Sequence, residues 1–128
     1  MKKTLLSLLI LLSSIPLFAQ DTAQALDFSA VDSYKKAARL HKKGKLSKIY
    51  MMPIDFGGDD SQVNTLFVPE FVKDFKDKVD KRIETLLYDG KKLSFEALPE
   101  YKGKSFVPSR LKIVVTGDEE FIETIDIW

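Results

Sequence analysis

The chain has 128 residues, 20 basic and 19 acidic side chains, a net charge of +1 and no cysteine. This length supports one domain with one hydrophobic core. The lack of cysteine excludes disulfides, thiol catalysis and thiolate metal sites. His41 is the only histidine, so one chain cannot hold zinc through two or three imidazoles, and no metal or cofactor is predicted.

The first segment, MKKTLLSLLILLSSIPLFAQ, has the layout of a secretory signal peptide. A positive start is followed by a short apolar run, then by Pro16 and by the small residue Ala19. The apolar run is shorter than the roughly 20 residues that a membrane-spanning helix needs. We expect residues 1–19 to be removed and the protein to be exported, either to the periplasm or out of the cell. A retained anchor and cleavage near Ala25 are the alternatives.

Loss of the signal would remove Lys2 and Lys3 and bring the net charge from +1 to about −1. No transmembrane segment is predicted after this cleavage. Residues 20–28 are predicted to be a flexible lead-in. Residues 29–128 are predicted to form a single α+β domain. Nucleic acid is a poor partner for a nearly neutral exported protein.

The domain is predicted to begin with a helix over about 30–43. Apolar and half-polar residues recur there at helical intervals, and Gly44 suits the end of the helix. Ser29 and Asp32 have the spacing of a capping box, with aspartate in place of the usual glutamate. Residues 46–54 then predict a strand that ends near Pro53.

The next elements are an extended segment over 63–68 and a long amphipathic helix from Pro69 to Asp89. Its outer face is expected to carry two ion pairs four residues apart, Asp74 with Lys78 and Asp77 with Lys81. Its apolar residues recur every three or four positions: Phe71, Val72, Phe75, Val79, Ile83, Leu86 and Leu87.

The remaining chain alternates as strands do, over 93–98, 106–116 and 121–128. Leu111, Ile113 and Val115 share one face of the middle strand. The short turns between strands predict antiparallel neighbours. The predicted fold is α+β: a small antiparallel sheet of three to five strands, one long amphipathic helix packed on one face, and a second, N-terminal helix.

The segment DFGGDD, residues 55–60, offers Asp55, Asp59 and Asp60 as hard oxygen ligands. The spacing does not fit the calcium loop of an EF-hand, and the kinase and P-loop motifs lack their other parts. Glycines permit a turn and aspartates cap backbone groups. We therefore expect an acidic turn that also contacts a partner.

A second candidate contact surface is basic. Seven basic residues and no acid lie between 35 and 48, which favours an anionic partner, either a lipid headgroup, a cell-wall polymer or an acidic protein surface. Part of this run would also stabilise the helix C-terminus. The residues expected to contact a partner are Lys35, Arg39, Lys42, Lys43 and Lys45.

These features lead to three hypotheses of function. The first is a small exported, non-catalytic binding protein of the cell envelope, such as an inhibitor or immunity-type protein directed at another protein. The second is a small hydrolase that uses one of the three aspartates with Glu96 or Glu100. The third is an envelope component that binds anionic polymer or lipid through the basic helix. The absence of a catalytic set favours the first.

Overall fold

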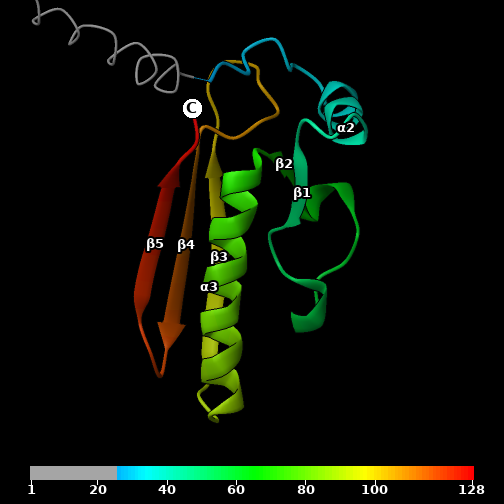
Figure 1. Ribbon diagram of the computed structural model, residues 1–128. Helices are drawn as coiled ribbons and strands as arrows, with labels where there is room; N and C mark the ends of the chain where they lie inside the picture. The colour runs from blue at the N-terminus through cyan, green and yellow to red at the C-terminus, as the bar shows by residue number, and fades with distance from the viewer. Residues whose placement is uncertain (1–25) are drawn as a thin grey trace, which may run out of the picture.

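The computed structural model describes residues 26–128, and Figure 1 shows their arrangement. The predictions on the signal segment and its cleavage concern residues outside this range. The helices are α2 (Tyr34–Lys42) and α3 (Glu70–Tyr88), with short 3-10 turns at Ile54–Phe56 and Gln62–Asn64. The strands are β1 (Ser47–Tyr50), β2 (Thr65–Val68), β3 (Leu93–Glu100), β4 (Arg110–Gly117) and β5 (Phe121–Asp126).

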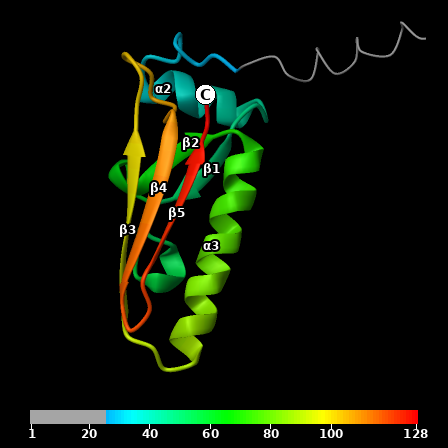
Figure 2. The same cartoon turned by 90° about the vertical axis from the view of Figure 1, so that its left-hand side faces the viewer.

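The last three strands form an antiparallel sheet in the order β3-β4-β5. The predicted alternation is confirmed, because Leu111, Ile113 and Val115 of β4 are buried. They belong to one core cluster with Val72, Val79 and Ile83 of α3. The long helix therefore covers one face of this sheet and runs nearly parallel to its strands (Figures 1 and 2). This confirms the predicted α+β fold.

Strands β1 and β2 form a separate antiparallel pair, with Ser47 opposite Val68 and Tyr50 opposite Thr65. Every residue of β2 is buried, which explains why its sequence shows no alternation. Ile49 and Val68 join the same core cluster as α3. The predicted strand over 46–54 is shorter than expected, because the chain leaves β1 after Tyr50.

Helix α2 begins later than predicted. The capping residue is Ser33, which has an extended backbone. Its side-chain oxygen accepts a hydrogen bond from the Lys36 amide at 3.1 Å. The expected capping role of Ser29 is wrong, since its own amide donates to the Asp27 carboxylate at 2.9 Å. The predicted partner, Asp32, forms an ion pair with Lys36 instead.

The ion pairs of α3 also differ from the prediction. Lys73 pairs with Asp77 at 2.7 Å, and Lys76 pairs with Asp80 at 2.7 Å. Asp77 has lysines four residues away on both sides, and the spacing alone does not choose between them. In the structure Lys81 instead lies 3.9 Å from Glu84.

The predicted strand over 106–116 begins at Arg110, because the preceding residues bond to other segments. The Phe106 amide donates to the Val31 carbonyl at 2.7 Å, and the Val107 carbonyl accepts from the Trp128 indole at 3.1 Å. These bonds tie the β3–β4 loop and the C-terminus to the segment before α2. Within residues 26–128, no helix has the length and apolar character needed to cross a membrane.

Candidate functional site

The main hollow surface of the domain lies between α3 and the segment from β1 to the first 3-10 turn. Three adjoining hollows of about 380, 520 and 370 Å³ share Asp55 in their linings. We call this surface the α3 groove. One half is lined mainly by charged and hydroxyl-bearing side chains: Lys48, Tyr50, Lys73, Lys76, Asp77 and Asp80. The other half is lined mainly by apolar ones: Met52, Phe56, Ile83, Leu87, Tyr88, Leu93 and Phe95.

The wall opposite α3 is a loop that Asn64 holds in place. The Asn64 side chain donates to the carbonyls of Met52 and Asp59 at 2.9 and 2.8 Å, and it accepts from the Met52 amide at 2.8 Å. Gly58 lies so close to Met52 that a β-carbon there would meet the Met52 carbonyl. Gly57 has a φ of 104°, which a side chain would disfavour. The glycines of DFGGDD thus serve the turn, as the sequence indicates.

The charged half contains ion pairs that satisfy one another. Lys76 is almost completely buried, and both carboxylate oxygens of Asp80 accept from its ammonium group. Burial raises the pKa of Asp80, while the hydrogen bond and charge of Lys76 act in the opposite direction. Desolvation, with a smaller contribution from the charge of Asp77, therefore outweighs the effect of a lysine in direct contact on the pKa of Asp80. Lys73 and Asp77 form a second, exposed pair beside it.

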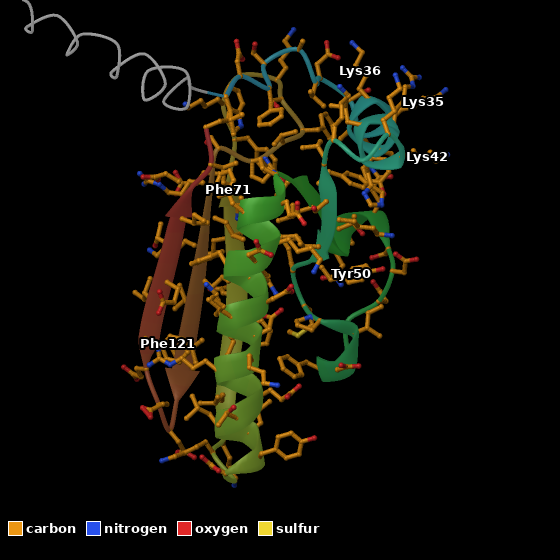
Figure 3. All side chains as sticks on the ribbon, viewed as in Figure 1. Lys35, Lys36, Lys42, Tyr50, Phe71 and Phe121 are labelled. Atoms are coloured by element: carbon orange, nitrogen blue, oxygen red, sulfur yellow. The ribbon has the colours of Figure 1, made fainter. Side chains whose placement is uncertain are left out.

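Across the groove, Asp60 accepts from Lys48 at 2.8 Å and from the Tyr50 hydroxyl at 2.9 Å. Tyr50 is labelled at the end of β1 in Figure 3. The hydrogen bond from Lys48 is the main reason why the pKa of Asp60 lies below its ordinary value. These bonds fix the loop end of DFGGDD to β1.

The apolar half ends at an exposed cluster. The Phe56 and Phe95 rings meet edge to face, with centroids 6.0 Å apart. Around them, Ile54, Leu87 and Tyr88 are 50%, 40% and 85% exposed. Large apolar side chains that gather at the surface mark binding sites more often than isolated ones do. This end of the groove is open to an apolar partner group.

The three aspartates of DFGGDD have different surroundings and do not converge. Asp55 lines the α3 groove, and Asp60 binds Lys48 and Tyr50. Asp59 accepts from the amide and hydroxyl of Ser61, and these hydrogen bonds lower its pKa. Among the described residues, no three carboxylate or histidine side chains are placed to hold a metal ion.

The residues of the hydrolase hypothesis also lie apart. Glu96 lines a different hollow, with Val114 and Thr116 on the outer face of the sheet, whereas Asp55 lines the α3 groove. Glu100 shares that outer face with Glu96, since both are exposed at alternate positions of β3. The structure gives these carboxylates no shared hollow.

The basic residues lie at the opposite end of the domain from the open apolar half of the groove (Figure 1). All five predicted contacts are exposed on α2 or just after it, and none forms an ion pair with a described residue: Lys35, Arg39, Lys42, Lys43 and Lys45. The structure therefore does not bring them together with the aspartates.

Sequence reasoning missed most of the groove. Lys76 lies on the apolar stripe of α3, four residues after Val72 and three before Val79. A lysine at such a position was a readable signal of a buried charge with a partner on the next turn. Tyr50 and Phe56 gave no such signal, because only the fold of the loop brings them to the groove.

Comparisons with protein-family models, with curated protein sequences and with solved structures found no match.

Proposed function

We propose that this is a small exported, non-catalytic binding protein that recognises another protein through the apolar half of the α3 groove. Export rests on the signal-peptide pattern of residues 1–19. An inhibitor or immunity-type protein of the cell envelope is the kind of protein that fits this description.

The observation that carries the proposal is the composition of the groove. Its apolar half contains aromatic and aliphatic side chains, and Leu87 and Tyr88 extend them to the open surface. Protein interfaces have this anatomy, with an apolar, aromatic centre and a polar rim. Charged pairs such as Lys73 with Asp77 supply that rim on one side. The partner surface would present an apolar ridge.

The chemistry of the charged half supports binding over catalysis. Its buried lysine is held by the neighbouring carboxylate Asp80, and Lys48 is held by Asp60. His41 lies outside the lining and its Nδ1 is 3.0 Å from the Leu46 carbonyl. A general acid or base needs a free group within reach of a substrate; within the described lining Asp55 is the one carboxylate outside an ion pair, and no second free carboxylate or histidine lines the groove with it.

Affinity capture from the cell envelope of the source organism tests the proposal. The bait carries a tag after Trp128, at the end of the domain away from the α3 C-terminus (Figure 1). The test variant replaces Leu87 and Tyr88 by serine. The control replaces Ile122, which is 57% exposed on the outer face of β5. We expect one protein to be captured by the unaltered bait and the control and to be lost with the Leu87→Ser, Tyr88→Ser variant.

Two results would count against the proposal. Equal capture by all three baits would place the interface elsewhere on the domain. Capture of no protein, even after chemical cross-linking in intact cells, would argue against a protein partner. Thermal unfolding of each bait shows whether a variant fails to capture the partner only because it is unfolded. Both replaced groove side chains are exposed, so the variants should unfold near the temperature of the unaltered protein.

A further inference from the structure

One end of the domain carries a continuous basic face on α2. Its outward residues fall within about 120° of the helix circumference. Its inward face packs on β2, where the Tyr34 and His41 rings lie 5.3 and 5.5 Å from the Phe67 ring. Ala37 is completely buried beneath them. The outward residues, including the C-cap residue, are all basic and exposed: Lys35, Lys36, Arg39, Lys42 and Lys43. Figure 3 shows Lys35, Lys36 and Lys42 projecting away from the domain.

The charge of this face is not neutralised by its surroundings. Of the basic residues on this face, only Lys36 has an acidic partner among the described residues, which is Asp32 at 2.7 Å. Helix α2 has no acidic residue in its first turn. The dipole of a helix of this length favours cations only within its last turn, so it does not account for Lys35 at the other end. A fixed surface of unpaired cations attracts an anionic partner.

The β3–β4 loop adds aromatic side chains to the same end. Tyr101 and Phe106 are 48% and 44% exposed, and the exposed Lys102 and Lys104 lie between them. The loop is fixed beside the segment that leads into α2, since the Ser105 hydroxyl donates to the Phe28 carbonyl at 2.8 Å. Figure 2 shows α2 and this loop together at one end of the domain.

We propose that α2 and the β3–β4 loop form a docking surface for a membrane that contains anionic phospholipid. Basic side chains bind the headgroups, while aromatic rings favour the boundary between headgroups and acyl chains. A soluble polyanion would account for the lysines but not for exposed Tyr101 and Phe106. The acidic β4–β5 turn, with Asp118 and Glu120 exposed, lies at the opposite end of the domain (Figure 1), so the charge distribution favours one orientation. This proposal is independent of the α3 groove.

Co-sedimentation with lipid vesicles tests the proposal. The protein is recovered after export from a bacterial host, and its N-terminus is read from the intact mass. The vesicles contain phosphatidylcholine alone or mixed with phosphatidylglycerol. We expect binding only to the mixed vesicles, weakened by salt. Lys35→Glu, Arg39→Glu and Lys42→Glu together should reduce the partition coefficient by at least about a hundredfold, because the loss of each basic residue near an anionic surface removes about one factor of five and glutamate adds repulsion.

A matched variant distinguishes the effect of this surface on vesicle binding from the effect of net charge. Lys78→Glu, Lys91→Glu and Lys92→Glu make the same charge change away from α2, at the middle of α3 and just after its C-terminus, where all three lysines are exposed. This control should bind as the unaltered protein does. Equal loss in both triple variants would overturn the proposal, as would failure of the unaltered protein to bind mixed vesicles. If the glutamate variant does not fold, glutamine at residues 35, 39 and 42 gives the same comparison.

Substitution of the aromatic residues distinguishes binding to lipid from binding to a soluble polymer. Tyr101→Ser with Phe106→Ser should weaken vesicle binding severalfold at high salt, where charge is screened. The same variant should bind heparin, a soluble polyanion, as the unaltered protein does. Heparin binding without vesicle binding would overturn the membrane proposal in favour of an anionic polymer. An aromatic variant that binds vesicles normally would also overturn it.

Discussion

The ammonium group of Lys76 lies 2.7 and 2.8 Å from the two carboxylate oxygens of Asp80, and the Lys76 side chain is only 2% exposed. One turn earlier, Lys73 and Asp77 have the same spacing and a 2.7 Å contact, but their side chains are 44% and 58% exposed. The two pairs differ mainly in burial. They offer a matched comparison of a desolvated and a solvated ion pair on one helix.

Replacing the buried pair by apolar residues should stabilise the domain. Taking both charges out of water opposes folding, and burial already raises the pKa of Asp80 despite its contact with Lys76. We expect Lys76→Met with Asp80→Leu to raise the free energy of unfolding by about 1 kcal/mol or more. Asp80→Leu alone should lower it by about 2 kcal/mol, because the buried ammonium then loses both acceptors. Urea unfolding measures both values.

The exposed pair provides the control. Lys73→Met with Asp77→Leu should change the free energy of unfolding by less than about 1 kcal/mol in either direction, as exposed ion pairs contribute little. If Asp80→Leu alone proves as harmless as the Lys73–Asp77 double variant, water reaches Lys76 and the pair is not desolvated in solution.

The pH dependence of stability should reveal the raised pKa of Asp80. Its ordinary value is 3.8, and the folded value lies above it, so the folded state binds this proton more tightly than the unfolded state. The corresponding stability is fully present below pH 3.8 and is lost as the pH rises through the folded pKa. Asp80→Asn stays neutral and keeps an acceptor for Lys76. Its stability relative to the unaltered protein should therefore increase as the pH rises from below 3.8 to neutral.

The pKa of other acids shifts in the opposite direction on folding, and their contribution to the pH dependence of stability must be subtracted. Hydrogen bonds from Lys48 and Tyr50 lower the pKa of Asp60, so its contribution is present above its ordinary pKa and is lost as the pH falls. This contribution is common to both proteins and cancels in their difference. A stability difference between Asp80→Asn and the unaltered protein that stays constant with pH would show that the Asp80 pKa is not raised.

The hydrogen bonds of the Asn64 side chain should control the shape of the groove wall. Asn64→Asp keeps the size of the side chain but replaces its amide donor by an acceptor that faces the carbonyls of Met52 and Asp59. We expect the free energy of unfolding to fall by about 2 kcal/mol. Hydrogen exchange should increase over the segment of residues 52–60. Unchanged exchange there would mean that the wall is held without the Asn64 side chain.

Gly58 should not tolerate a side chain. An added β-carbon would collide with the Met52 carbonyl oxygen and lie 2.9 Å from the Asn64 amide nitrogen, so the loop backbone would have to move. Gly58→Ala should lower the free energy of unfolding by about 2 kcal/mol. Gly57→Ala is the control, because its β-carbon meets nothing within 4 Å and only its φ of 104° is unfavourable. An unchanged free energy of unfolding in Gly58→Ala would contradict the close packing.

The architecture followed from periodicity where one face of an element is buried. The stripe of α3 and the alternation of β4 each reflect a single buried face, so their patterns were clear. For β2, which is buried on every side, periodicity could only indicate an extended segment. The start of α2 was misplaced because Ser29 and Ser33 both suit a helix cap, and only the bond from Lys36 to Ser33 decides between them.

The groove was largely beyond sequence reasoning. It forms where the loop carrying Met52 and Phe56 meets α3, and these residues are far apart in the chain from Ile83 and Leu87. The acidic turn was predicted, but spacing does not encode that Asp60 accepts from Tyr50 while Asp55 lines the groove.

Site-specific photo-crosslinking from the groove tests the central claim most directly. A photo-reactive amino acid replaces Leu87 in the apolar half of the groove, and in a matched protein it replaces Ile122 on the outer face of the sheet. Irradiation of intact cells that produce each protein should give one defined protein adduct from position 87 and none from position 122. Adducts from neither position, or equal adducts from both, would contradict a protein-binding role for the α3 groove.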